Sequence, residues 1–253
     1  MRWDLFWVHK SYFGNTEADV GFSVFSAPHL IWLCLMLLFI AAFAVRYCRR
    51  DETGRDNMRK GMALFLILFE IFKQCVVGLT GAPAIGTMPL EICSFAEYTI
   101  LADAYWPKNR SLGQFLVLAF LPASIMALAF PTVTAYPPIS FFAIHQFVLH
   151  AGIAAYIIAR YAAGEIRPRY SGLWISVLVI GLLAVPIYLI DLKFGANFMF
   201  LTSHSGNPVL KLLWNLAGGN GGLAYDAALV AFVALVLHVV FGIYSLIGLA
   251  RRK

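Results

Sequence analysis

Long apolar stretches alternate with short polar ones along most of this chain. A helix needs about 20 largely apolar residues to cross the roughly 30 Å of hydrocarbon in a bilayer. Stretches of about that length recur between charged residues, glycines and prolines. We therefore expect seven membrane-spanning helices, over 25–45, 61–79, 88–105, 111–130, 138–161, 173–192 and 226–249.

The composition agrees with a protein that lies in a membrane. Hydrophobic residues make up 61% of the chain and charged residues 13%, and the mean hydropathy is +0.78. A water-soluble fold of this composition would have too little polar surface to cover itself. The sequence therefore predicts an all-α, polytopic helical bundle in which residues 1–253 form a single transmembrane domain.

The basic residues are concentrated in alternate connections. Two intervening connections, "TGAPAIGT" and "PTVTAYPP", contain no lysine or arginine. By the positive-inside rule we expect the basic connections in the cytoplasm, the N-terminus outside and the C-terminus inside. This orientation explains the net charge of +6, so we expect no nucleic-acid partner. The basic residues are Arg46, Arg49, Arg50, Arg55, Arg59 and Lys60; Lys108 and Arg110; Arg167 and Arg169; and Arg251, Arg252 and Lys253.

Two further patterns bear on processing and on metals. The first two dozen residues contain no long apolar core before a cleavage site, so we expect no cleaved signal peptide. Cys34, Cys48, Cys75 and Cys93 form no CxxC pair and most fall within predicted helices, which favours free thiols. Neither HExxH nor HxxxH spacing occurs, so any metal site would need ligands from separate helices, and we expect no metal or cofactor.

The connection over 193–225 is longer than the others. Its apolar middle part, "VLKLLWNLAGG", is too short to cross a bilayer and predicts an interfacial or re-entrant helix at the outer mouth of the bundle. Pro122 and Pro186 lie inside predicted spans, where proline removes a backbone hydrogen bond and kinks a helix. We therefore expect a distortion at each.

Ionisable and polar side chains stand inside several predicted spans. An ionisable group at the bilayer centre costs about 2.5–3.5 kcal/mol on insertion scales, so it points to a functional site with a partner. The predicted orientation places these groups in the outer half of the bundle, with His145 and His150 about 10 to 18 Å deep at 1.5 Å per residue. We expect an outward-opening site formed by Glu70, Lys73 and Gln74; Glu91, Cys93 and Glu97; His145, Gln146 and His150; and, near the outer boundary, His29 and Asn197.

Cys93, in "MPLEICSF", has the most polar surroundings of the four cysteines. Pro89 predicts a helix start just before it, and a helix N-terminus favours a thiolate. His145 and His150 lie at a compatible depth but point about 140° apart, so one helix face cannot present both. A cysteine with a histidine base forms acyl-enzyme intermediates. We predict that Cys93 is a nucleophile, although a buried free cysteine is more often an inert small hydrophobe.

Glu70, Lys73 and Gln74 also have a purely structural interpretation. Glu70 and Lys73 are three residues apart and Gln74 is four residues from Glu70, so all three share one helix face. Paired charges of this kind also hold membrane helices together. The pattern alone does not choose between these roles.

Four segments carry a resemblance to a known family. "FSAPHLIWL", "MPLEICSF", "FFAIHQFVLHAG" and "GANFMFL", in that order, resemble the YwaF-like integral membrane proteins of bacteria over about His29 to Leu201. A vertebrate relative is an endoplasmic-reticulum acyltransferase that remodels ether phospholipids through a cysteine acyl intermediate. The resemblance implies Cys93 as nucleophile, His145 or His150 as base, Asn197 as a polar site residue and a bacterial inner-membrane location. The family pattern, Leu-Pro-Leu-His-Leu-Cys, has histidine where this chain has Glu91.

Two functions therefore remain open. The first is a lipid acyltransferase, transacylase or acyl hydrolase that takes acyl chains from membrane phospholipids through a thioester on Cys93, with Gln146 or Asn197 as oxyanion donors. The alternative is a transporter or sensor in which the buried charges form a pathway for a small solute or protons, although no inverted repeat is present. A bundle that only scaffolds a partner is the third reading. The first predicts sensitivity to loss of the thiol and the second sensitivity to loss of the carboxylates.

Overall fold

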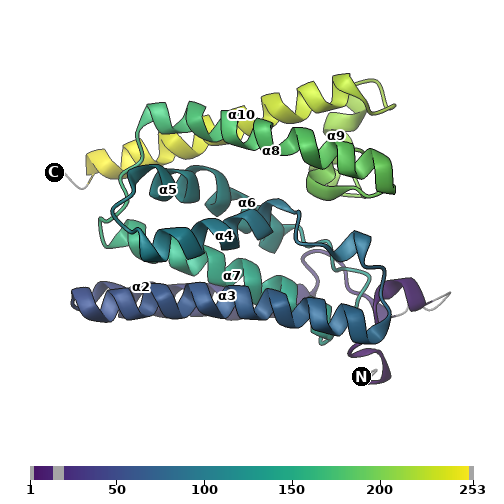
Figure 1. Cartoon of the computed structure of the whole chain (residues 1–253), viewed down its shortest axis with the longest axis horizontal. Coiled ribbons are helices and arrows are strands. Elements are labelled where there is room, and N and C mark those ends of the chain that lie inside the picture. The colour runs from purple at the N-terminus through teal and green to yellow at the C-terminus, as the bar shows by residue number, and fades with distance from the viewer. Residues whose placement is uncertain (1–2, 14–19, 251–253) are drawn as a thin grey trace.

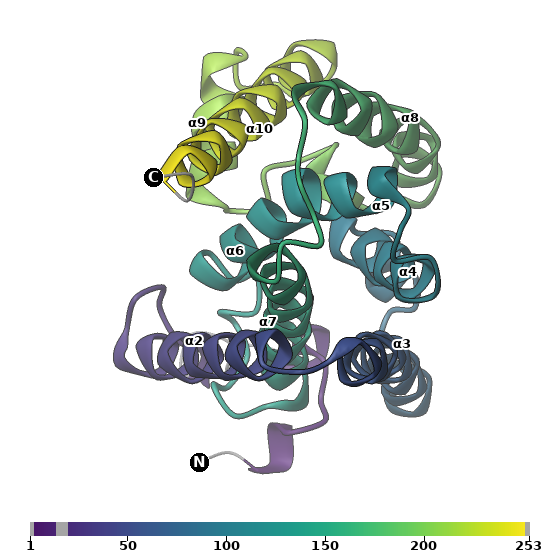
Figure 2. The same cartoon turned by 90° about the vertical axis from the view of Figure 1, so that its left-hand side faces the viewer.

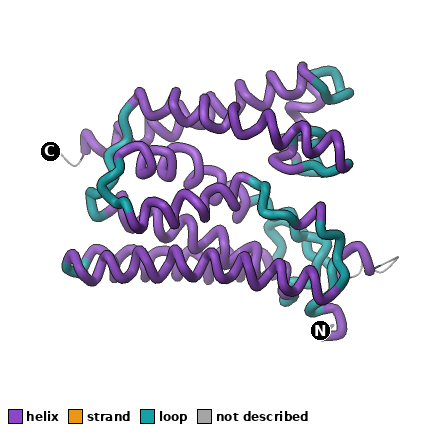
Figure 3. Tube along the Cα trace, in the orientation of Figure 1, coloured by secondary structure: helices purple, strands orange, loops and turns teal. Residues whose placement is uncertain are grey.

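The computed structural model describes residues 3–13 and 20–250, with side chains up to residue 246, so the basic residues Arg251, Arg252 and Lys253 lie outside it. The described residues form helices and loops without a β-strand, which confirms the all-α class (Figure 3). Six helices are long and apolar enough to cross a membrane. They are α2 (Ala27–Cys48), α3 (Glu52–Thr80), the continuous helix Arg110–Ala129, α7 (Phe141–Ala162), α8 (Tyr170–Phe194) and α10 (Leu223–Ala250).

The third predicted span is shorter than the other six and does not have the length of a membrane-spanning helix. It is α4 (Ile92–Tyr105), a helix of 14 residues. At 1.5 Å per residue it measures about 21 Å, less than the roughly 30 Å of hydrocarbon. Its start is delayed because Glu91 has an extended backbone, with ψ 161°. Six helices therefore meet the length of a membrane span instead of the seven expected, although α4 still joins the 81–91 connection at one end of the bundle to the 106–109 connection at the other.

Helix α7 is the central helix of the bundle, surrounded by α2, α3, α4 and α6 (Leu121–Ala129) (Figure 2). The hydroxyl of Ser140 caps its start by accepting from the Ala143 N–H at 3.3 Å. A Cβ added to Gly152 would lie 2.8 Å from Leu66 Cδ2 on α3, so glycine permits close packing there. This packing fixes the register between the histidines of α7 and the polar residues of α3.

The helix over 110–129 is distorted in its middle. It consists of α5 (Arg110–Phe115), a π-helical turn labelled η5 (Leu116–Phe120), and α6. The widened turn ends just before Pro122, which has no N–H to donate to the preceding turn. The distortion expected at Pro122 is thus a π-helical turn, whereas α8 continues as one helix through Pro186.

Helices α8 and α10 form an outer pair on one side of the bundle (Figure 1). Leu118, Leu173 and Leu237 form a small apolar core between this pair and η5. The connection between α8 and α10 contains the nine-residue helix α9 (Pro208–Leu216), capped by Asn207. The short helix expected in this connection is therefore confirmed.

The connections divide between the two ends of the bundle (Figure 1). We call one the basic end; it holds the connections 49–51, 106–109 and 163–169. We call the other the Cys93 end; it holds the connections 81–91, 130–140 and 195–222. The N-terminal segment lies there too, because the Phe6 carbonyl accepts from the Phe141 N–H at 2.9 Å. Connections predicted to share a side of the membrane thus lie together, while the cytoplasmic side remains a prediction.

Candidate functional site

Cys93 lies in the first turn of α4, in agreement with the helix start predicted just before it. The carbonyl of Glu91 accepts from the N–H groups of Ser94 at 3.0 Å and Phe95 at 3.3 Å. The Cys93 thiol is partly buried and packs against the main apolar core beside Ile92 and Phe95. The unpaired N–H groups of a first helical turn form the positive end of the helix dipole. The helix dipole favours a thiolate at this position, whereas burial and the nearby carboxyl groups of Glu91 and Glu97 favour the neutral thiol.

The side chain of Glu91 holds the outer connection over the start of α4. Its Oε2 accepts from the Met199 N–H at 2.8 Å. Met199 and Phe200 have positive φ angles of 54° and 60°, so the backbone turns sharply at this contact. Asp191, near the end of α8, accepts from the adjacent Phe198 N–H at 2.9 Å. Two carboxylates from different segments therefore fix this turn.

Asn197 organises the same connection from within. Its Oδ1 accepts from the N–H groups of Thr202 and Ser203, both at 2.9 Å. Its Nδ2 donates to the Ser203 carbonyl at 2.9 Å and to the Ser205 hydroxyl at 2.8 Å. Both polar ends of this amide are thus engaged in the loop, which makes it a loop anchor here rather than a free oxyanion donor.

Glu70 is the centre of a polar network on α3. Its Oε1 pairs with Lys73 Nζ at 2.7 Å and accepts from Gln74 Nε2 at 2.8 Å. Gln74 also donates to the Thr87 carbonyl at 2.7 Å. Glu70 Oε2 faces His145 Nε2 on α7 at 3.4 Å, within ion-pair range but without hydrogen-bond geometry. The trio predicted to share one helix face does so, and it reaches the central helix.

The two histidines of α7 are both buried but differ in their contacts. His145 stacks near Phe69, with ring centroids 4.6 Å apart, and faces Glu70. His150 Nδ1 lies 2.7 Å from the Gln146 carbonyl, which requires the proton on Nδ1. The Nε2 atom of His150 then carries a lone pair. Since no other hydrogen bond of this ring occurs among the described residues, Nε2 is free to accept a proton.

Glu97, on α4, has no hydrogen-bond partner for either carboxylate oxygen among the described residues. Its side chain is 0% exposed. Buried polar groups nearly always find partners in native proteins, so an unpaired carboxylate is a specific indication of a function or of a missing ligand. The sequence indicates Glu97 only as a polar residue within a predicted span. Its lack of a hydrogen-bond partner follows from the three-dimensional structure.

Lys73 is the cation of this region. Its charge acts on Cys93, Glu97, His145 and His150. The fold therefore brings together Glu70 and Lys73 of α3, Cys93 and Glu97 of α4, and His145 and His150 of α7, and we call these residues the Cys93 cluster. Within the described part of the chain the Cys93 thiol makes no hydrogen bond to either histidine. Catalytic hydrogen bonds of this kind are often long without substrate and tighten in the complex.

The remaining predicted site residues have local roles. His29 Nδ1 accepts from the Phe25 N–H at 2.8 Å, so Nε2 carries the proton and donates to the Leu128 carbonyl at 2.9 Å. Nε2 thus joins α2 to the end of α6, while Nδ1 holds the chain just before α2. Gln146 Nε2 donates weakly to the Ala127 carbonyl at 3.4 Å, which leaves its second amide hydrogen available. Among the described residues no group of three or more His, Cys, Asp or Glu side chains is arranged to hold a metal ion.

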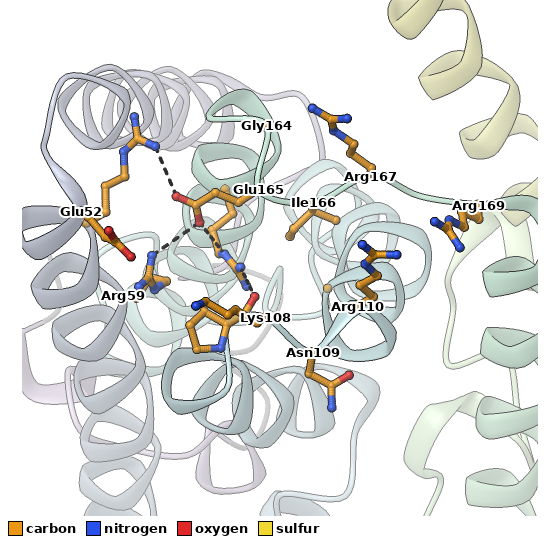
Figure 4. A pocket seen from close by; sticks show the side chains of 14 residues that line it. Glu52, Arg59, Lys108, Asn109, Arg110, Gly164, Glu165, Ile166, Arg167 and Arg169 are labelled. Atoms are coloured by element: carbon orange, nitrogen blue, oxygen red, sulfur yellow. Dashed lines mark hydrogen bonds and ion pairs between the residues drawn. The ribbon is translucent and has the colours of Figure 1, made fainter.

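A second buried network lies at the basic end, and sequence analysis missed it. Asp103 on α4 pairs with Arg160 on α7 and accepts from the Tyr156 hydroxyl at 2.6 Å. Arg160 also donates from Nε to Glu165 at 2.9 Å and from Nη2 to the Pro107 carbonyl at 2.8 Å. The available signal was an acidic and a basic residue in two predicted spans at the same depth. A cavity of about 810 Å³ opens beside this network (Figure 4).

A family model matches most of the chain. The model of the TMEM164 family covers residues 24–244, which include the whole Cys93 cluster. Neither a curated protein nor a solved structure matches the chain. Together with the six apolar helices, the family match identifies an integral membrane protein. The relation to YwaF-like bacterial proteins has no support in these comparisons.

Proposed function

Because this chain belongs to the TMEM164 family, we propose that it is a membrane lipid acyltransferase that carries an acyl chain as a thioester on Cys93. Family membership is consistent with such an activity. The observation that carries the cysteine mechanism is the assembly of the Cys93 cluster: a thiol in the first turn of a helix, a cation, two buried histidines and a buried unpaired carboxylate. The substrate is an acyl chain of a membrane phospholipid, and the bacterial inner membrane remains the expected location.

The proposed reaction has two half-reactions. In the first, Cys93 Sγ attacks the carbonyl carbon of a phospholipid ester while its proton passes to His150 Nε2. The ester C–O bond breaks, the lysophospholipid leaves with that proton, and the acyl group remains as a thioester. In the second, a hydroxyl group of an acceptor lysophospholipid gives its proton to His150 and attacks the thioester. The new ester forms, and the thiolate recovers the proton from His150.

Residues in and beside the cluster support these steps. His150 is preferred over His145 as base because its Nδ1–H bond to the Gln146 carbonyl leaves Nε2 as the acceptor. Lys73 provides positive charge for the thiolate and for the developing oxyanion, to which Gln146 donates its free amide hydrogen. Glu97 has the acceptor capacity to bind an acceptor hydroxyl, which would give its carboxylate the partner it lacks. Glu91 keeps the 198–200 turn closed over the start of α4.

The test is acyl exchange in nanodiscs of phosphatidylcholine with an ether lysophospholipid as acceptor, followed by lipid mass spectrometry. Cys93→Ala should lower the transfer rate by at least about 1,000-fold, because the thioester cannot form. Cys75→Ala is the matched control, since Cys75 is an exposed thiol on α3, and it should retain the wild-type rate. Transfer by Cys93→Ala within about twofold of wild type would exclude the cysteine mechanism.

The transporter alternative predicts that loss of the carboxylates has a larger effect than loss of the thiol. If the buried charges form a solute or proton pathway, Glu91→Gln and Glu97→Gln should stop flux in proteoliposomes while Cys93→Ala leaves it intact. Flux that depends on the carboxylates and not on the thiol, together with no acyl exchange, would replace the acyltransferase with this function.

A further inference from the structure

The cavity at the basic end is lined by residues from four separate segments. They come from the start of α3, residues 107–113 at the start of α5, the end of α7 and the 163–169 connection. Its volume of about 810 Å³ falls in the range of small-molecule sites, about 300–1,000 Å³. Seven basic side chains and two acidic ones line it, an excess of five positive charges. The basic ones are Arg55, Arg59, Lys108, Arg110, Arg160, Arg167 and Arg169, and the acidic ones are Glu52 and Glu165.

Three of the arginines form a charge-paired floor around Glu165, in which Arg59 also pairs with Asp56 and Arg160 with Asp103. Arg160 contacts this carboxylate at 2.9 Å, and Arg55 and Arg59 each approach it at 3.5 Å (Figure 4). The Tyr47 hydroxyl donates to Glu165 at 2.8 Å and accepts from Arg59 at 2.9 Å. Arg160 is 2% exposed, so the floor is a preorganised part of the protein interior.

The other four cations differ from these arginines in exposure and in pairing. Lys108, Arg110, Arg167 and Arg169 are exposed, and in the described part of the chain none has a carboxylate within 4.0 Å. Figure 4 shows Arg110, Arg167 and Arg169 on the far side of Ile166 from Arg59, with Lys108 between the two groups. No carboxylate of the described residues balances their charges. The cavity therefore has a floor of paired charges around Glu165 and a positive rim formed by these four cations.

The positive-inside rule explains why these connections are basic but not why their side chains surround one cavity. The same end of the bundle carries Arg49 and Arg50, which obey the rule equally and do not line it. Guanidinium groups form bidentate hydrogen bonds to phosphate, and lysine contributes a point charge. We propose that this cavity is a second ligand site, which binds the phosphate group of an anionic lipid or of a soluble organic phosphate.

The proposal extends beyond the proposed function, because the cavity lies at the basic end and Cys93 at the other (Figure 1). The negative charge of two or more phosphate oxygens matches a rim of four unpaired cations better than a neutral or zwitterionic headgroup does. The volume leaves space for a group larger than inorganic phosphate. If the basic end faces the cytoplasm, it meets the leaflet surface where anionic lipids attract basic segments.

The experiment uses the full-length protein and two probes. One arm titrates sodium pyrophosphate into protein in neutral detergent and measures heat. The other measures, by native mass spectrometry, how much phosphatidic acid the protein retains from nanodiscs of phosphatidylcholine containing it. The test variant is Arg167→Gln with Arg169→Gln, and the matched control is Arg49→Gln with Arg50→Gln, an equal loss of charge at the same end. Lys108→Gln with Arg110→Gln replaces the test variant if helical circular dichroism shows that it is misfolded.

We expect the test variant to weaken binding by about tenfold or more, since charge-assisted hydrogen bonds are lost, and the control to weaken it little. An effect only in the lipid arm identifies a headgroup site, and an effect only in the pyrophosphate arm a soluble phosphate. Failure of both probes to bind, or equal weakening by the test and control pairs, would overturn the proposal. Neither result depends on Cys93 chemistry.

Discussion

The two ends of the bundle each bury a charged cluster, but the clusters differ in how completely their members are paired. At the basic end Arg160 contacts two carboxylates, Glu165 and the tyrosine-bound Asp103, and one backbone carbonyl. At the Cys93 end Glu97 has no hydrogen-bond partner within the described residues, and His150 Nε2 is free. Paired buried charges fix helices to one another, whereas unpaired ones remain available to a substrate.

This difference predicts opposite responses to the loss of one group. Removing one partner of a buried ion pair leaves the other charge uncompensated, which is strongly destabilising. An unpaired buried carboxylate already carries its desolvation cost, so neutralising it should not weaken the fold. Stability should therefore depend most on paired charges, above all the basic-end network, and turnover on the unpaired groups of the Cys93 cluster.

The largest expected effect on stability is at Arg160. Arg160→Met should lower the free energy of unfolding by about 3–5 kcal/mol, because Asp103 would be left buried without its cation. Equilibrium unfolding in mixed detergent micelles measures the change. Arg49→Met, at an exposed position of the same end, should change it by less than about 0.5 kcal/mol. Equal losses in the two variants would show that the buried network is not what stabilises this end.

The next effect is on the proposed base. His150→Gln should reduce acyl transfer by about 100-fold or more, the usual contribution of a general base, while the protein remains folded. His29→Gln is the comparison, because it removes an equally buried histidine whose two nitrogens are both used in structural contacts. It should lower stability without changing the rate per folded molecule. A similar loss of rate in both variants would contradict the role given to His150.

The smallest effect separates the two carboxylates of the Cys93 cluster. Glu70→Gln should lower the free energy of unfolding by about 1–3 kcal/mol, because Lys73 loses its charged partner. Glu97→Gln should leave the value unchanged or raise it by about 1 kcal/mol, since no contact is lost. The same unfolding measurement compares them. A loss at Glu97 as large as that at Glu70 would mean that Glu97 has a partner in the folded protein.

The apolar pattern predicted the spanning helices well, and its two errors have physical causes. The third span is short because the extended backbone of Glu91 delays the start of α4, although Glu91 lies within an otherwise apolar window. The second helix starts at Glu52 rather than near residue 61, because Asp51 caps it, accepting from the Gly54 N–H at 3.0 Å, and its first turns are charged. Hydropathy does not detect a helix that extends into water.

The site was predicted in part, and contacts distant in sequence account for the rest. Depth and helix direction were enough to group Cys93 with the α3 carboxylate and the α7 histidines. Depth and helix direction could not show that His29 Nε2 donates to the Leu128 carbonyl, 99 residues away, or that both ends of the Asn197 amide bond within its own loop. The basic cavity was not predicted, because its cations come from four segments and their pattern in the sequence indicated only orientation in the membrane.

The most direct test of the central claim is the intact mass of the purified protein after incubation with mixed phospholipids in nanodiscs. Peptide mapping then locates any added mass. A thioester mechanism predicts one fatty-acyl adduct on Cys93 that hydroxylamine removes and that is absent from Cys93→Ala but present in Cys75→Ala. Acyl exchange that proceeds without an adduct on Cys93, even when the acceptor lipid is withheld so that the intermediate accumulates, would contradict it.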